Sequence, residues 1–274
     1  MTAPTKDRHP RINLERIDGV AFIVLNRPER RNALDDSLFV DELRSLWAEL
    51  REDLEVVVVV LTGAGDSFCA GADLEDCSGF RRADAADAED FIRTTLEPVV
   101  ALQQLPQLTI AAVNGAAVGA GFGLSLACDI RIASPTARFM SPFVRMGLVP
   151  DYGLSYLLPR VVPMHAALDI MLTGRFVDAN EALGLGLVAR IVGDPVRDAL
   201  EYAHRIASGP KRAIRVTKSA LYQAMTLNMT DAVLIEEARS QAIALHGTEF
   251  RERYREWREQ ILHSRGPSPA GPTQ

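Results

Sequence analysis

The chain has 274 residues, of which 47% are hydrophobic, and its formal net charge at pH 7 is −6. This length allows one large domain or two small ones with a sizeable core. The acidic charge and the absence of a basic block argue against a nucleic-acid partner. The N-terminal sequence MTAPTKDRHPR has no hydrophobic signal region, so we expect a cytosolic protein.

Neither the cysteines nor the histidines are spaced like metal ligands. The three cysteines form no Cys-x-x-Cys pair, and in a reducing compartment they are expected to be free thiols. The five histidines are scattered, with no pair at helical spacing. We therefore expect no metal site.

Predicted strands and helices alternate through the first half of the chain, after a lead at residues 1–10 that is expected to be disordered. Apolar and β-branched runs predict strands over residues 12–17, 20–25, 56–61, 109–113 and 130–133. A hairpin turn at Asp18-Gly19 joins the first two. Helices are predicted over residues 37–50 and 91–105, and the charged residues 76–90 predict either a mobile loop or the solvated start of a helix. The alternation favours stacked βαβ units, in which ligands bind at the turns that follow the strands.

The second half of the chain is predicted to be mostly helical. Helices are expected over residues 168–172, 179–183, 196–207, 213–225, 231–245 and 248–263, and residues 187–192 are expected to be extended. The polar, proline-rich tail is expected to be disordered.

The most informative stretch is residues 108–132, with the sequence LTIAAVNGAAVGAGFGLSLACDIRI. An apolar strand breaks at residues 114–115 and passes through the small residues 119–121 into an apolar helical segment at 124–128. Small residues leave backbone N–H groups uncovered, and a helix N-terminus points such groups outward with a partial positive charge. This construction is typical of an oxyanion site. A membrane span is disfavoured because residues 114–115 interrupt the run and the charges at 129–131 close it too early.

Two further turns carry candidate chemistry. Residues 67–74 follow a buried strand and its glycine turn, and small residues again expose the backbone at 70–72. Taken alone, this segment is explained by a strand-to-helix turn capped by Asp73. Residues 147–153 contain a Pro-Asp-x-Gly turn, which taken alone is explained by Asp151 as the cap of the next helix.

Together with two flanking motifs, these turns form an ordered set along the chain. Its members are Arg27-Pro28…Asn32-Ala33-Leu34, Ala70-Gly71-Ala72-Asp73-Leu74, Asn114-Gly115-Ala116-Ala117-Val118-Gly119-Ala120-Gly121 and Thr173-Gly174-Arg175…Glu181-Ala182…Gly186-Leu187-Val188. In order, spacing and context the set resembles the enoyl-CoA hydratase/isomerase family, also called the crotonase family. The resemblance covers roughly residues 12–260.

The resemblance implies an α/β fold: a crotonase-like spiral of repeated ββα units with a C-terminal helical trimerisation region. It implies a spiral core over residues 11–195, a helical oligomerisation region over 196–263 and a disordered tail over 264–274. It also implies acyl-CoA thioester substrates, no metal, and no cofactor apart from the coenzyme A that the substrate carries. Besides the substrate, the expected partners are further copies of the same chain, which would form a trimer or a dimer of trimers.

The resemblance also assigns the reacting groups. The backbone N–H groups of Ala72 and Ala120 would hold the thioester oxygen, although the family usually has glycine where Ala120 stands. The two glutamates of the hydratases fall at Gly123 and Phe143 and are absent. Asp151 matches the working aspartate of some family isomerases, of the ring-epoxide isomerases and of the chlorobenzoyl-CoA dehalogenases. One carboxylate suffices to move a proton between two carbons, whereas adding water requires a second group to activate the water.

The remaining candidate contacts lie on loops around these turns. Phe143 and Tyr152 are expected to form part of a dry acyl pocket, and burial there would make Asp151 more basic. Arg31 is a candidate partner for a phosphate group of coenzyme A. Trp257 matches a phenylalanine that the family often has near the coenzyme A of the neighbouring subunit. The other expected substrate contacts are Ala33, Ala70, Asp73, Leu74 and Gly119. Cys69 is expected to be a buried structural thiol, since no histidine lies near it in the sequence.

Three functions are open at this point. The leading interpretation is an enoyl-CoA isomerase in which Asp151 is the acid and base. The second is an enoyl-CoA hydratase or another crotonase reaction, including one in which Asp151 is the nucleophile. The third is a non-catalytic acyl-CoA-binding protein, which would have no need of Asp151.

Overall fold

The structure is a computed structural model that describes residues 11–36, 38–75 and 85–264. The chain forms two compact units, of which the first ends at Ser208 and the second begins at Gly209. The segments expected to be disordered, 1–10 and all but the first residue of 264–274, lie outside the described residues, as does the larger part of the charged stretch 76–90. Among the helices of the described segments, none combines the length and the apolar composition of a bilayer-spanning segment.

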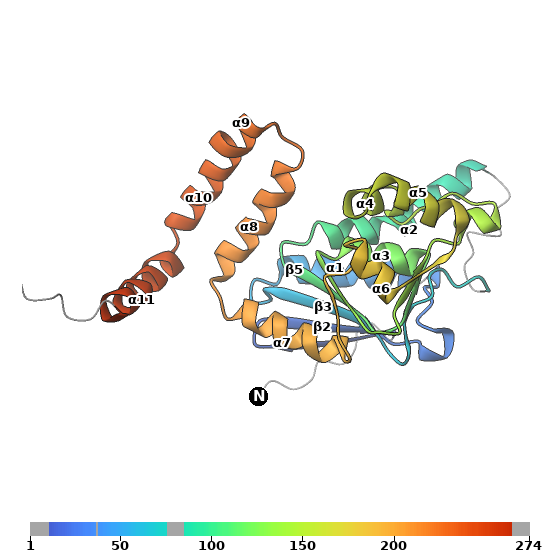
Figure 1. The fold of residues 1–274 in the computed structure, drawn as a ribbon, viewed down its shortest axis with the longest axis horizontal. Helices are drawn as coiled ribbons and strands as arrows, with labels where there is room; N and C mark the ends of the chain where they lie inside the picture. Colours follow the sequence, from blue (N-terminus) through green and yellow to red (C-terminus); the bar gives the residue numbers. More distant parts are fainter. Residues whose placement is uncertain (1–10, 37, 76–84, 265–274) are drawn as a thin grey trace, which may run out of the picture. The chain divides into compact units, whose positions relative to one another are not determined.

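A six-stranded sheet runs through the first unit. Its strands, in spatial order, are β1 (Ile12–Ile17), β2 (Val20–Leu25), β3 (Val58–Gly63), β5 (Leu108–Val113), β7 (Ile130–Ala133) and β10 (Arg190–Ile191). Figure 1 labels β2, β3 and β5 of this sheet. β1 and β2 form the predicted antiparallel hairpin, with Asp18 and Gly19 in the left-handed conformation at its turn. The other neighbouring strands are parallel. All six residues of β3 are buried, as expected for a parallel strand covered on both faces.

Four strands of three residues each form a second sheet that was not predicted from the sequence. They are β4 (Ser67–Cys69), β6 (Ala116–Val118), β8 (Arg138–Met140) and β9 (Phe176–Asp178). β4, β6 and β8 are parallel, and β9 runs antiparallel to β8. Three residues are too few to show a two-residue alternation, so hydrophobic periodicity could not reveal these strands.

From β3 to β8, successive strands alternate between the two sheets, and an α-helix follows each pair. β3 and β4 precede α2 (Ala85–Gln103), whose first residues lie in the charged stretch 76–90 that was predicted to be a loop or the start of a helix. β5 and β6 precede α3 (Ala120–Ala127), and β7 and β8 precede α4 (Leu154–Val161). This repeat confirms the expected spiral of ββα units. It also brings the ends of β4 and β6, which lie far apart in the sequence, next to each other.

Amphipathic helices cover the large sheet. α1 (Leu43–Glu52) follows a short π-helix (Leu38–Glu42) and buries one apolar face made of Leu43, Leu46, Trp47 and Leu50. α7 (Pro195–Ala207), capped by the Asp194 carboxylate, packs against β2, β3, β5 and β7 (Figure 1). α5 (Met164–Thr173), α6 (Ala179–Gly184) and two short 3-10 helices, Pro28–Arg30 and Phe143–Met146, complete the helices of the described first unit.

The second unit is helical. It consists of α8 (Lys211–Ala224), α9 (Met229–Asp231), a π-helix (Ala232–Glu237), α10 (Ala238–Leu245) and α11 (Thr248–Ser264). α8 packs against the π-helix and α10. The expected helical region began at residue 196, but α7 lies in the first unit and the boundary falls after residue 208.

Candidate active site

Two glycine-rich segments emerge side by side from the small sheet. β4 and β6 are parallel, with Cys69 paired to Ala117, so residues 70–72 and 119–121 leave the sheet together. A Cβ on Gly71 would lie 2.6 Å from the carbonyl oxygen of Val118 and 3.3 Å from the nitrogen of Ala120. Gly71 also has a φ of +88°. A side chain there would force the two segments apart, so this glycine allows their close approach.

The N–H of Ala72 points away from its neighbouring strand segment. The N–H of Leu34 donates to the carbonyl oxygen of Gly71 at 2.8 Å, and the N–H of Asp73 donates to that of Leu34 at 2.8 Å. Backbone groups alternate in direction along an extended chain, so the N–H of Ala72, which lies between these two bonds, faces away from Leu34. Within the described residues, we find no hydrogen-bond partner for this N–H.

The N–H of Ala120 is the second uncommitted donor. Ala120 is the first residue of α3, and the first N–H groups of a helix have no partner inside it. The N–H of the preceding Gly119 donates to Met140 at 2.9 Å, whereas the described part of the chain offers the N–H of Ala120 no acceptor. The positive end of the helix dipole adds to this donor. Two such donors on adjoining segments can stabilise an oxyanion.

Two asparagine side chains hold the turn between β3 and β4, which leads into residues 70–72. The Asn32 amide donates to the carbonyl oxygens of Ala64 and Ser67 at 2.9 and 2.8 Å. The Asn114 amide donates to those of Gly63 and Gly65 at 2.8 and 2.9 Å. Both asparagines belong to the sequence motifs, but their partners lie more than 30 residues away, so the sequence assigned them no role.

Asp151 is half-buried and directly precedes Tyr152 and Gly153, which both have a positive φ. The carbonyl oxygen of Asp151 accepts the N–H of Leu154 at 3.0 Å, but no side chain caps α4. The interpretation of the Asp151 carboxylate as a helix cap is therefore wrong. Burial raises the pKa of this carboxyl to about 6, although the backbone N–H of the same residue opposes the rise. A carboxylate with this pKa can accept and return a proton near neutral pH.

The side chain of Tyr152, the next residue in the Pro-Asp-x-Gly turn, is buried in the core. Its φ of +49° is unusual for a residue with a side chain, and its side chain is 1% exposed. Burial raises the pKa of the Tyr152 hydroxyl, and the nearby Cys69 and Asp151 raise it further. Tyr152 therefore lies in the core beneath the turn, not on an open pocket wall. Cys69 is buried as expected, and burial raises the pKa of its thiol to about 12.

The Asp151 turn packs directly against the first turns of α3. A Cβ on Gly123 would lie 2.1 Å from the carbonyl oxygen of Tyr152 and 3.1 Å from its Cβ. The helix position that would carry the first hydratase glutamate thus has no room for any side chain. The second position holds Phe143, which is 7% exposed. Its ring lies next to Gly119, because a Cβ added to Gly119 would be 3.7 Å from Cζ of Phe143.

The other predicted contacts divide into two groups. Ala70 and Gly119 belong to the paired segments, and Ala33 precedes Leu34, which bridges to Ala72. The N–H of Ala70 donates to the carbonyl oxygen of Arg31 at 3.0 Å. Arg31 itself is exposed, as is Leu74. Trp257 lies in the second unit and is 60% exposed, and its expected contact with coenzyme A stays a prediction.

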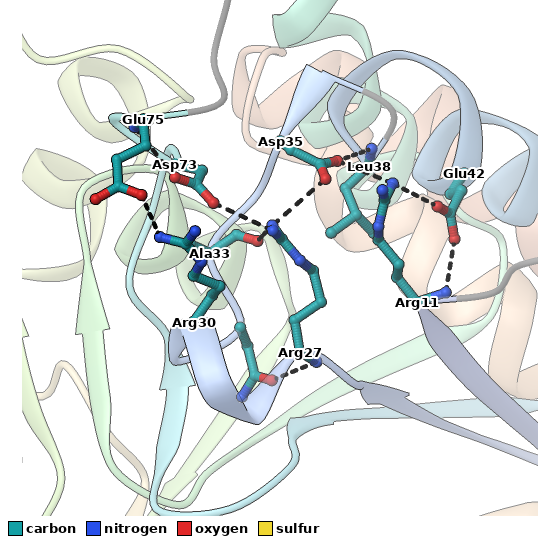
Figure 2. Close-up of polar contacts among 10 residues, drawn as sticks. Arg11, Arg27, Arg30, Ala33, Asp35, Leu38, Glu42, Asp73 and Glu75 are labelled. Atoms are coloured by element: carbon teal, nitrogen blue, oxygen red, sulfur yellow. Dashed lines mark hydrogen bonds and ion pairs between the residues drawn. The ribbon is translucent and has the colours of Figure 1, made fainter.

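The Asp73 carboxylate is engaged within the protein. The guanidinium of Arg27 lies 3.2 Å from it, and it also accepts the N–H of Glu75 at 3.2 Å (Figure 2). The carboxylate therefore joins the segment that follows Ala72 to Arg27, and a substrate contact by Asp73 stays a prediction. Across the described residues, no group of three histidine, cysteine, aspartate or glutamate side chains could hold a metal ion.

Comparisons with known proteins show which family the chain belongs to. Residues 15–261 match the family model for enoyl-CoA hydratase/isomerase. The chain is 34% identical to "Probable enoyl-CoA hydratase 1, peroxisomal" of Arabidopsis thaliana, over 92% of each chain. It also resembles the crystal structure of an enoyl-CoA hydratase from Bacillus anthracis, with 31% identity, a TM-score of 0.85 and coverage of 91% and 96%.

A third relative was crystallised with a thioester. This Thermobifida fusca YX protein, in complex with acetoacetyl-CoA, is 33% identical, with a TM-score of 0.78 and coverage of 86% of this chain and 94% of that one. The family match spans most of the chain, and the two strand ends carry the uncommitted N–H groups that its motifs predict. The chain therefore belongs to the enoyl-CoA hydratase/isomerase family.

Proposed function

We propose that the protein is an enoyl-CoA isomerase, which moves a carbon–carbon double bond in an acyl-CoA thioester. One observation carries the proposal: Asp151, whose carboxyl has a pKa of about 6, belongs to the turn that packs against α3, the helix whose first residue is Ala120. At the first of the two hydratase positions, Gly123, the Tyr152 carbonyl leaves no room for a second carboxylate. The complex of the related Thermobifida fusca protein with acetoacetyl-CoA supports a coenzyme A thioester as the substrate.

In the proposed reaction, the thioester oxygen accepts hydrogen bonds from the N–H groups of Ala72 and Ala120. The Asp151 carboxylate removes a proton from C2 of a 3-enoyl-CoA, and the electron pair of that bond delocalises onto the thioester oxygen as a dienolate. The protonated Asp151 then gives the same proton to C4, which leaves the double bond between C2 and C3. Each donor that stabilises the dienolate more than the ground state contributes about 3–4 kcal/mol.

A spectroscopic screen with 3-enoyl-CoA and 2-enoyl-CoA thioesters tests this proposal. An isomerase converts the 3-enoyl thioester into the conjugated 2-enoyl thioester, whose ultraviolet absorbance rises. A hydratase removes that absorbance from the 2-enoyl thioester. Turnover of neither substrate, together with tight acyl-CoA binding, would indicate a non-catalytic binder instead.

Hydration is the second candidate function, because the relatives in Arabidopsis and Bacillus anthracis are named enoyl-CoA hydratases. It would require Asp151 to act with water alone. A rapid loss of 2-enoyl-CoA absorbance without isomerisation of the 3-enoyl substrate would favour hydration over the isomerase.

We also propose a homo-oligomer built from trimers. Large apolar side chains are exposed on the second unit, among them Leu221, Met225, Met229, Leu234 and Ile235. Exposed apolar surface of this kind is typical of interfaces. Light scattering at micromolar concentration should give the mass of a trimer or of a dimer of trimers, and a monomer would contradict the proposal. The cytosolic location stays a prediction.

A further inference from the structure

A buried arginine joins the two chain segments that flank Ala72. Arg27 is 9% exposed, and its Nη1 donates to the carbonyl oxygen of Ala33 at 2.7 Å. Its Nη2 lies 3.2 Å from Oδ2 of Asp73. Figure 2 shows the guanidinium between Asp73 on one side and Asp35 on the other.

These contacts lie on either side of the strand bridge that orients Ala72. Leu34 and Ala72 form this bridge. Ala33 directly precedes Leu34, and Asp73 directly follows Ala72 in the sequence. The Arg27 guanidinium therefore links the two segments next to the peptide whose N–H faces away from the bridge.

Arg27 is itself held by a second set of contacts. Oδ2 of Asp35 lies 3.5 Å from its Nη1, while Oδ1 of Asp35 accepts the N–H of Leu38 at 3.0 Å. Arg11 also contacts Asp35, at 3.2 Å. The guanidinium is thus tied to the start of a helix, which limits its movement.

We propose that Arg27 is a positioning residue that sets the direction of the Ala72 N–H toward the thioester oxygen, acting through Asp73 and Ala33. This inference rests on the proposed use of Ala72 as an oxyanion donor. Oxyanion donors must be held within about 0.5 Å and 10–20° of their productive geometry. Buried ion pairs are weak evidence for stability, whereas a planar guanidinium with directional hydrogen bonds fixes geometry well.

Two conservative variants test the proposal. Arg27→Lys keeps the charge but loses the fork of donors, and Asp73→Asn keeps the shape but loses the charge. Glu75→Gln is the matched control, because the Arg30–Glu75 ion pair joins the same two segments at the exposed surface. The measurements are kcat and KM for 3-enoyl-CoA isomerisation, and the infrared carbonyl stretch of bound butanoyl-CoA labelled with ¹³C at the carbonyl.

We expect each of the two variants to lower kcat by about 10- to 100-fold, with a change in KM of less than about threefold. The carbonyl stretch of the bound thioester should move back toward its value in water. The double variant should lose little more than either single one, because both act through the same contact. Glu75→Gln should match the wild type in all measurements.

Wild-type kcat and a wild-type carbonyl stretch in the folded Arg27→Lys and Asp73→Asn variants would overturn the proposal. So would a loss of activity with an unchanged carbonyl stretch, which would indicate a general structural role. The carbonyl stretch measured with the wild type distinguishes a failure of the Arg27 proposal from a failure of the proposed function. If bound butanoyl-CoA shows no shifted stretch even there, Ala72 is not an oxyanion donor and both proposals fall.

Discussion

Replacing Asp151 by asparagine should stabilise the folded protein at neutral pH while removing the proposed activity. Burial raises the pKa of this carboxyl from 3.8 to about 6, so above pH 6 the folded state contains a poorly solvated carboxylate. A tenfold change in an acid dissociation constant corresponds to about 1.4 kcal/mol. The rise therefore corresponds to about 3 kcal/mol of destabilisation, which the uncharged asparagine removes.

The pH dependence of this effect has a definite sign. Below pH 3.8 the Asp151 carboxyl is protonated in both the folded and the unfolded state, so the variant gains nothing. Between pH 3.8 and 6 mainly the unfolded state ionises, and the stability of the wild type falls as the pH rises. We expect the free energy of unfolding of Asp151→Asn to exceed that of the wild type by about 3 kcal/mol at pH 7.5 and by about 1 kcal/mol at pH 4.5.

Urea unfolding followed by tryptophan fluorescence measures this difference. Asp90→Asn is the control, because Asp90 is an exposed residue of α2. It should stay within about 0.5 kcal/mol of the wild type at both pH values. An Asp151→Asn variant no more stable than the wild type at pH 7.5, or equally stabilised at both pH values, would refute the reasoning.

Three further predictions concern the same region. Gly123→Ala should lower the free energy of unfolding by about 1–3 kcal/mol, because its Cβ would meet the Tyr152 carbonyl. Gly184→Ala is the control, because nothing lies within 4 Å of its added Cβ. A similar loss of stability in Gly184→Ala, measured by urea unfolding, would contradict a clash with the Tyr152 carbonyl as the cause. The kcat/KM for isomerisation should rise with pH and level off above about 6 as Asp151 loses its proton, and a flat profile from pH 5 to 8 would count against Asp151 as the base. Cys69 should be alkylated only after unfolding, as read by mass spectrometry, because its thiol is buried and has a pKa of about 12; rapid labelling of the folded protein would contradict this.

Sequence patterns predict the large sheet and the uncovered backbone of residues 70–72 and 119–121, because both depend on local features. The hairpin bounds at residues 12–17 and 20–25 follow from two apolar runs and one turn dipeptide. The glycines beside Ala72 and Ala120 mark the backbone that must stay bare. The small sheet escapes prediction because each of its strands has only three residues.

The positioning groups could not be predicted because they act across long stretches of sequence. Arg27 reaches Asp73, 46 residues away, and Asn114 reaches Gly63, 51 residues away. A local pattern gives no signal for such pairs. The same holds for Tyr152, whose backbone blocks Gly123 only after the spiral has folded.

The most direct test of the central claim, that Asp151 alone moves the substrate's proton, compares isomerisation and hydration by the wild type and Asp151→Asn under the same conditions. The wild type should isomerise a 3-enoyl-CoA briskly and hydrate a 2-enoyl-CoA poorly. Asp151→Asn should lose about 10²–10⁴-fold in isomerisation while its affinity for the thioester stays nearly unchanged, because the oxyanion donors are backbone groups elsewhere. Brisk hydration by the wild type, or full isomerase activity in Asp151→Asn, would contradict the account.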